Sequence, residues 1–259
     1  MRWKIASLAE AGAEALQFRQ PQTSPGAEPR SFMPANLHLF GIAHLAILAA
    51  VTLLALLLAA LQRRLPPGSR AVRVALALLL LLCTILYYGR YAALGEQMFP
   101  GHLPLELCDV SLWLVIPALL TLKPAIFDLA YYFAMAGASM SLLTPNLLDP
   151  SLFLSVQFFA DHGLLVTAIL YLVWSRQARP RPGSVGRAML VFNILIALIG
   201  TFDFIFKTNY MFLRAKPETV SLLTFLGPWP WYIVAGDGVA FSLFLLLYLP
   251  FRQTSANAS

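Results

Sequence analysis

The sequence predicts an all-α fold, an integral membrane bundle of seven transmembrane helices with the N-terminus outside and the C-terminus inside. Hydrophobic residues make up 59% of the 259 residues and charged residues only 12%, about half of the charged fraction of ordinary globular domains. Seven apolar runs each approach the roughly 20 residues that a helix needs to cross a bilayer. Lys and Arg also alternate between successive loops, as the positive-inside rule requires.

The chain divides into an N-terminal tail (residues 1–38), a seven-helix transmembrane domain (39–252) and a C-terminal tail (253–259). The start of the N-terminal tail has apolar residues at roughly helical spacing, so it can form an amphipathic helix lying on the membrane surface. A linker with several prolines follows this stretch. The tail lacks the continuous apolar core of a signal peptide.

The seven predicted spans follow one another closely. They lie near residues 39–61, 71–93, 103–122, 124–144, 152–174, 187–206 and 229–250. The third and fourth are separated only by Lys123 and Pro124, which predicts two antiparallel neighbours joined by a tight turn. The sequence contains no internal repeat, so it does not favour a transporter built from duplicated halves.

The loop charges predict the orientation in the cytoplasmic membrane. Residues 62–70 and 175–187 are rich in arginine, whereas loops 95–102 and 145–151 contain no Lys or Arg. The arginine loops are therefore expected inside. This topology accounts for the net charge of +6, so we do not expect nucleic acid as a partner. The long loop after residue 206 also carries basic residues, and we expect it to form a structured cap on the outer side.

Most ionisable residues inside the spans gather at one depth, in the outer half or near the midplane. They are His44, Arg90, Glu106, Cys108, Asp109, Asp161, His162, Asp203 and Asp237, whereas Asp128 belongs to the inner half. Charged groups at membrane depth are costly and usually serve a function. The pattern predicts one polar cavity open to the outer face, with Arg90 neutralising some carboxylates. The alternative is that these carboxylates form buried salt bridges between helices.

A thiol and an imidazole occur among these residues, and together they are the minimum set for nucleophilic acyl chemistry. Cys108 follows Glu106 at the start of the third span, and His162 interrupts the fifth. Cys83 lies inside a continuous apolar run, and we expect it to be only a small lipid-facing or core residue. The two cysteines do not indicate a disulfide framework.

Several sequence strings resemble the YwaF-type family of bacterial seven-span integral membrane proteins. They are LPLELCDVSLW, LLTPNL, FFADHGLL, GTFDFIFKTNYMFLRAKP and TFLGPWPWYI, and the resemblance covers about residues 36–252. That family is similar to an animal cysteine acyltransferase of ether lysophospholipids, whose Cys and His match Cys108 in LELCD and His162 in FFADHG. The resemblance implies a thioester mechanism, and the expected partners are membrane lipids as substrate. We expect no cofactor, and the sequence leaves protein partners unknown.

The remaining polar residues are candidates for supporting roles. Asp161 or Asp203 can orient His162 in the usual triad logic, although adjacent residues on one helix diverge in direction, which disfavours Asp161. Arg90, or the Asn209–Tyr210 pair, can hold a phosphate or a developing oxyanion. Glu106, Asp109 and Asp237 complete the set of residues expected to line the cavity or bind substrate.

Other functions fit parts of the same pattern. An intramembrane lipid-ester hydrolase, including a metal-dependent one that uses His44, His102, His162 and Cys108, is one alternative. However, the sequence contains no HxxxH or CxxC pairing, so we predict no metal site. A transporter or receptor for a small molecule or lipid is another, because inward carboxylates suit proton-coupled transport. The thiol discriminates between these classes, since a transporter should tolerate Cys108→Ser.

Overall fold

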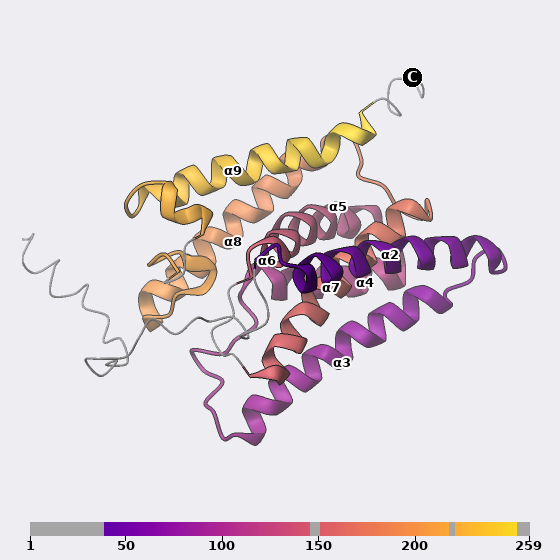
Figure 1. Ribbon diagram of the computed structural model, residues 1–259. Helices are drawn as coiled ribbons and strands as arrows, with labels where there is room; N and C mark the ends of the chain where they lie inside the picture. Colours follow the sequence, from indigo (N-terminus) through magenta and orange to yellow (C-terminus); the bar gives the residue numbers. More distant parts are fainter. Residues whose placement is uncertain (1–38, 146–150, 218–220, 253–259) are drawn as a thin grey trace, which may run out of the picture. The chain divides into compact units, whose positions relative to one another are not determined.

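The computed structural model of the chain describes residues 39–145, 151–217 and 221–252. These parts consist of helices and connecting loops and contain no strand (Figure 1). The predicted N-terminal tail with its interfacial helix, and the C-terminal tail after Arg252, lie outside the described residues.

The helices follow the predicted order. They are α2 (Ile42–Arg64), α3 (Ala71–Ala93), α4 (Leu107–Thr121), α5 (Pro124–Phe133), the π-helical turn η1 (Ala134–Ala138), α6 (Ser139–Leu143), α7 (Leu152–Trp174), α8 (Ser184–Phe206) and α9 (Trp231–Tyr248), with short 3-10 turns η2 (Tyr210–Phe212), η3 (Leu222–Phe225) and η4 (Leu249–Phe251). Six helical segments of the described chain are long and apolar enough to cross a membrane, with α5, η1 and α6 counted together.

The third predicted span, 103–122, is shorter than expected. Helix α4 has 15 residues, which corresponds to about 22 Å and is less than the ~30 Å hydrocarbon core. The residue before a proline is pushed toward extended conformations, so Pro104 prevents the helix from starting at Leu103. Glu106, the residue just before the helix, also has an extended backbone, with φ −70° and ψ 156°. The described chain therefore has six membrane-length helices and one shorter apolar helix.

The tight turn between the third and fourth spans has the expected consequence. Leu122 ends α4 in the left-handed region, with φ 54°, and Pro124 starts α5 at a position where its missing N–H is not needed. Helices α4 and α5 then pack against each other. In this respect the prediction of two neighbouring helices is confirmed.

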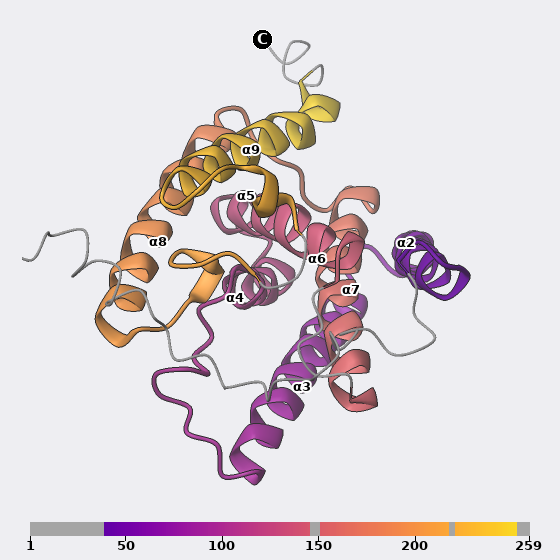
Figure 2. The same cartoon turned by 60° about the vertical axis from the view of Figure 1, so that its left-hand side comes forward.

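Helix α4 lies among α3, α5 and α7, and α3 also contacts α7 (Figure 2). Helices α8 and α9 pack side by side, and α2 packs chiefly along α7. Gly163 permits the close approach of α2, because a Cβ there would lie 3.0 Å from Val51 Cγ2.

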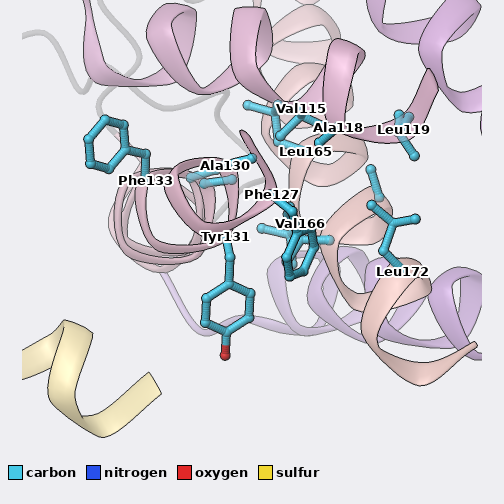
Figure 3. Packing of buried hydrophobic residues seen from close by; sticks show 14 of the residues in the cluster. Val115, Ala118, Leu119, Phe127, Ala130, Tyr131, Phe133, Leu165, Val166 and Leu172 are labelled. Carbon is cyan, nitrogen blue, oxygen red and sulfur yellow. The ribbon is translucent and has the colours of Figure 1, made fainter. Parts of the chain in front are cut away.

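The apolar core centres on α4, α5 and α7, and α3, α8 and α9 also contribute buried side chains to it. Figure 3 shows part of this core. Val115 and Ala118 of α4 and Leu165 of α7 are almost fully buried there. Removing such side chains from lipid contact brings no hydrophobic gain, so close packing is the main force that holds these helices together.

An ion-pair cluster joins α5 to the loop between α7 and α8 and to the first turn of α8. Asp128, only 1% exposed, lies 2.8 Å from Arg181 Nη2 and 3.0 Å from Arg187 Nη2. The Arg181 backbone N–H donates to the same carboxylate. The carboxylate that the sequence assigned to the inner half thus lies against the predicted inner arginine loop.

Candidate functional site

The N-terminus of α4 positions Cys108. Glu106 caps the helix, its side chain accepting from the Asp109 backbone N–H, while Asp109 Oδ2 accepts from the Glu106 N–H at 3.1 Å. This reciprocal capping box satisfies two N–H groups that the helix start would leave unpaired. Cys108 lies between the two capping carboxylates, partly buried and packed against the apolar core. The position of the thiol is therefore defined by the helix cap.

A π-helical turn packs against this end of α4. Gly137 in η1 lies so close to Leu107 that a Cβ would be 3.0 Å from Leu107 Cδ2. The turn also contacts α7. Such turns insert one extra residue into a helix and are frequent at functional sites.

Polar side chains connect α3, α4 and α7 beside the thiol. The Tyr88 hydroxyl donates to Asp109 Oδ1 at 3.4 Å. Gln157 Nε2 donates to the Cys83 carbonyl and to Asp161 Oδ2, each at 2.8 Å. The Cys83 thiol also interacts with the Asp161 carboxylate. These bonds hold Asp161 at the junction of the three helices.

Four carboxylates form what we call the acidic cluster: Glu106, Asp109, Asp161 and Asp203. Their charges interact in sequence, Asp203 with Glu106, Glu106 with Asp109, and Asp109 with Asp161. Cys108 interacts electrostatically with three of them, Glu106, Asp109 and Asp161. None of the four has a salt bridge within the described ranges.

Two oxygen atoms of the acidic cluster are buried without a hydrogen-bond partner in the described parts of the chain. They are Asp161 Oδ1 and Asp203 Oδ2. Buried polar atoms are paired in the great majority of cases, and an exception in a native protein calls for an explanation. The Asp161 carboxylate interacts electrostatically with both thiols, Cys83 and Cys108.

His162 lies on α7, next to Asp161, and is 7% exposed. Its Nδ1 is 2.8 Å from the Phe158 carbonyl oxygen, and the Phe158 ring lies over the imidazole with centroids 4.3 Å apart. A carbonyl can only accept, so the proton is on Nδ1 and Nε2 carries the lone pair. This is the tautomer that a general base needs.

The orienting partner of His162 differs from the predicted one. The sequence offered Asp161 or Asp203, but Asp161 bonds Gln157 and Asp203 bonds the loop after α8. Consecutive residues of a helix point about 100° apart, so Asp161 and His162 face different neighbours. A backbone carbonyl one turn earlier takes the orienting role.

Cys108 and His162 are on helices that contact each other, α4 and α7. The two side chains form no hydrogen bond in the described structure. The interactions of the thiol are instead with the acidic cluster. Catalytic hydrogen bonds are often long or unformed before substrate binds, so a Cys108–His162 pair stays a prediction.

The loop after α8 is hydrogen-bonded to the start of α4 and to the residues just before it. The Met211 N–H donates to Glu106 Oε2 at 2.9 Å. Tyr210 accepts from the Leu103 N–H and donates to the Pro100 carbonyl, both at 2.7 Å. Burial raises the pKa of Tyr210, so its hydroxyl stays protonated and keeps donating at physiological pH.

Asp203 and Asn209 stabilise this same loop. Asp203 Oδ1 accepts from the Thr208 hydroxyl and the Tyr210 N–H. Asn209 Oδ1 accepts from two backbone N–H groups, and its amide donates to the Ala215 carbonyl. Asn209 and Tyr210, which the sequence offered as an oxyanion or phosphate site, thus have their polar atoms bonded within the loop and its neighbours.

Two predicted cavity residues contact other parts of the molecule. The Arg90 guanidinium lies 5.0 Å from the centre of the Phe153 ring and makes no salt bridge to a described carboxylate. Asp237 on α9 accepts a hydrogen bond from Asn193 on α8 at 3.1 Å. The structure therefore brings together Cys108 and the acidic cluster, and it places Arg90 and Asp237 in separate contacts.

The other histidines have local partners. His44 is fully buried, accepts at Nδ1 from the Phe40 N–H, and lies 2.7 Å from the Leu142 carbonyl through Nε2. His102 lies against Tyr91, with ring centroids 4.5 Å apart. In the described ranges, no three His, Cys, Asp or Glu side chains are grouped so as to hold a metal ion.

Sequence reasoning missed Cys83, Tyr88 and Gln157. Cys83 and Tyr88 sit inside an apolar run, and Gln157 carries no charge, so none of them stood out by residue type. A signal was present in spacing, because Gln157 and Asp161 are four residues apart and share a helix face.

These observations define the class of protein. The long apolar helices, and the polar residues sealed among them, are those of a multi-pass protein embedded in a membrane. The chain belongs to the TMEM164 family, whose model matches residues 38–248. Comparison with curated proteins and with solved structures gave no match. The likeness to YwaF-type proteins, and through them to an acyltransferase, stays a prediction.

Proposed function

We propose that the protein is a membrane-embedded acyltransferase that acts on phospholipids or other lipid esters, with Cys108 as the nucleophile and His162 as the general base. The observation that carries the proposal is the pairing of helices α4 and α7. A thiol fixed by a helix cap lies on one, and a histidine in the base tautomer lies on the other.

The proposed reaction has two steps. In the first, His162 Nε2 takes the thiol proton and Cys108 Sγ attacks the ester carbonyl carbon of the lipid. The bond from this carbon to the glycerol oxygen breaks, and that oxygen takes the proton from the imidazolium. A thioester and a lysolipid result. In the second step an acceptor hydroxyl gives its proton to His162 and attacks the thioester carbonyl carbon. The bond from this carbon to Cys108 Sγ breaks, and the thiolate takes the proton back from the imidazolium.

Asp161 is suited to position the acceptor. Its Oδ1 is buried without a partner among the described residues, and the same carboxylate interacts with Cys108. A hydroxyl that donates to this oxygen would stand beside the thioester. When the acceptor is water, the same thioester gives an intramembrane lipid-ester hydrolase, so the two activities share one covalent intermediate.

We also propose the orientation with the arginine loops 62–70 and 175–187 on the cytoplasmic side of the cytoplasmic membrane, and with α4 counted as a seventh span. The charge alternation between loops supports this orientation. The ion pairs of Asp128 with Arg181 and Arg187 agree with it, because they keep the start of α5 at the arginine face.

A proton-coupled carrier is the second candidate, and the acidic cluster favours it. Buried carboxylates without salt bridges are the groups that such carriers use. The two functions differ in their need for Cys108. A carrier should work with serine at that position, whereas thioester chemistry should not.

The test is acyl transfer by the purified protein in vesicles that contain a phospholipid with a labelled acyl chain and a lysophospholipid acceptor. Cys108→Ala and His162→Ala should each abolish transfer, and the double variant should be no worse than either. Thr84→Ala, beside Cys83 on α3, is the control and should retain transfer, because the Thr84 hydroxyl donates within its own helix to the Leu80 carbonyl. Full transfer by folded Cys108→Ala would rule out the covalent mechanism and favour the carrier.

A further inference from the structure

A groove runs along α2 at the end of the molecule that carries the arginine loops. Its volume is about 350 Å³, and its lining consists of Leu53, Leu56, Leu57, Ala59, Ala60, Arg63 and Trp174. The α2 residues among these recur three or four positions apart, so they form one helix face. The groove is therefore a strip of apolar side chains that ends at a guanidinium and an indole.

The polar end of the groove is held in place. Arg63 Nη2 donates to the Trp174 carbonyl at 3.0 Å, which ties the end of α2 to the end of α7. The rest of the guanidinium has no bond to a described carboxylate. The Trp174 indole N–H has no hydrogen-bond partner in the described chain. The Arg63 guanidinium and the Trp174 indole N–H are thus available as hydrogen-bond donors. Tryptophan is enriched at the membrane–water interface, so we expect both groups to lie at that depth.

The charges around this end favour an anion. Loops 62–70 and 175–187 contain no Asp or Glu. Arg181 and Arg187 form ion pairs with Asp128. The last turn of α2, by contrast, presents Arg63 and Arg64 without any described acidic partner. Basic pockets between membrane helices, with apolar walls, bind anionic lipid head groups.

The groove is separate from the proposed acyl-transfer site. Trp174 lies 13 residues after Asp161 on α7 (174 − 161), which corresponds to about 20 Å along the helix axis. The groove also lies at the arginine end of α2, whereas His44, at the other end of this helix, bonds the end of α6. A ligand of the groove would therefore sit in the leaflet on the arginine side.

We propose that this groove is a binding site for an anionic phospholipid, distinct from the substrate. An acyl chain lies along the leucines and alanines of α2, and the phosphate accepts from Arg63 with the Trp174 indole N–H beside it. The lipid fills the space between α2 and the end of α7, the two helices that Arg63 joins.

Native mass spectrometry of the full chain in detergent tests the proposal without any turnover, so the result does not depend on acyl transfer. Phosphatidylglycerol and phosphatidylcholine with identical acyl chains are the probes. Phosphatidylglycerol adducts should exceed phosphatidylcholine adducts, and Arg63→Gln should reduce them about five-fold, the effect of one basic residue on attraction to anionic lipid. Arg64→Gln removes the same charge in the same turn, outside the groove, and should leave the adducts largely unchanged.

A second pair of variants tests the apolar part. Ala60→Trp fills the groove and should reduce phosphatidylglycerol binding, whereas Leu54→Trp changes an exposed α2 position outside the lining and should not. If the two variants of either pair lost phosphatidylglycerol binding equally, the loss would reflect a general surface effect and would overturn the proposed site. Equal binding of phosphatidylcholine, or displacement of phosphatidylglycerol by inorganic phosphate, would overturn the assignment to an anionic lipid.

Discussion

At the scale of single residues, Gln157 connects the parts of the candidate site. Its amide donates to a backbone carbonyl on α3 and to Asp161 one turn later on α7. A neutral amide can do this inside a membrane at a far lower cost than a charged group. Asp161 depends on it, because Gln157 donates to one carboxylate oxygen while the other oxygen is buried without a hydrogen-bond partner in the described structure.

We therefore expect Gln157→Ala to destabilise the protein by about 1–3 kcal/mol, the usual cost of leaving a buried polar group unpaired. Thermal unfolding in detergent measures this change. Gln97→Ala, at an exposed loop position, is the control and should leave the midpoint unchanged. Equal midpoints for both variants would mean that Gln157 does not support Asp161.

The hydrogen-bond partners of the candidate residues could not be predicted from the sequence, and the chemical roles of Cys108 and His162 stay predictions. Cys108 and His162 stand out because a thiol and an imidazole interrupt apolar runs. The Phe158 carbonyl that orients His162 could not be found by residue type, because every residue carries a carbonyl. Gln157 bonds Cys83, which is 74 positions away, and only the packing of α3 on α7 brings the two together.

At the scale of elements, the start of α4 is set by its contacts with the π-helical turn η1. Gly137 leaves just enough room for Leu107, the residue before Cys108. A methyl group at Gly137 would push against Leu107 Cδ2 at 3.0 Å and Cγ at 3.2 Å. The position of the thiol therefore depends on a glycine in another helical segment.

We expect Gly137→Ala to be less stable than Gly186→Ala by about 1–2 kcal/mol, which is the cost of overpacking. Both substitutions gain similar helix propensity, but a Cβ at Gly186 meets nothing within 4 Å. Unfolding of both variants in detergent gives the difference. Leu107→Ala should cost less in the Gly137→Ala background than in the wild type, and strict additivity would contradict the proposed contact.

The loop after α8 is bonded through the Tyr210 hydroxyl to the chain before α4, and this contact can be tested. Tyr210→Phe removes the hydroxyl that bonds both Leu103 and Pro100, so we expect a loss of about 1–2 kcal/mol and faster proteolysis of the chain before α4. Tyr248→Phe is the control, because the Tyr248 hydroxyl makes no hydrogen bond in the described structure. Unchanged proteolysis in Tyr210→Phe would show that this loop does not hold the start of α4.

Elements were easier to predict than their lengths. Apolar runs bounded by Pro, Gly and Arg gave the helices in the right order, because burying backbone N–H and C=O groups in a bilayer leaves few alternatives to a helix. The start of α4 was wrong because Leu103 and Leu105 are as apolar as the helix itself. These leucines pack against Ile199 and Tyr210 instead, a tertiary contact that hydropathy does not reveal.

At the scale of the whole molecule, this multi-pass membrane protein has two different ends. The arginine loops and the Asp128 ion pairs lie at one end. The capped start of α4 and the loop after α8 form the other, where Met211 bonds Glu106. By the positive-inside rule, we propose that the first end faces the cytoplasm.

Cysteine labelling tests this orientation. In a background with Cys83→Ala and Cys108→Ala, we expect Gln97→Cys to react with an impermeant reagent in intact cells and Ser69→Cys to react only after permeabilisation. Gln97 lies in the loop between α3 and α4, and Ser69 lies in the loop between α2 and α3. Labelling of Ser69→Cys in intact cells would reverse the orientation.

The proposed thioester on Cys108 is tested most directly by the intact mass of the protein after incubation with phospholipid vesicles. The account predicts a mass increase of one acyl group, placed on Cys108 by peptide mapping and released by hydroxylamine, as a thioester is. The adduct should persist in Cys83→Ala and accumulate more slowly in His162→Ala. An unmodified mass in folded protein that still transfers acyl chains, or an adduct carried by Cys83 instead, would contradict the account.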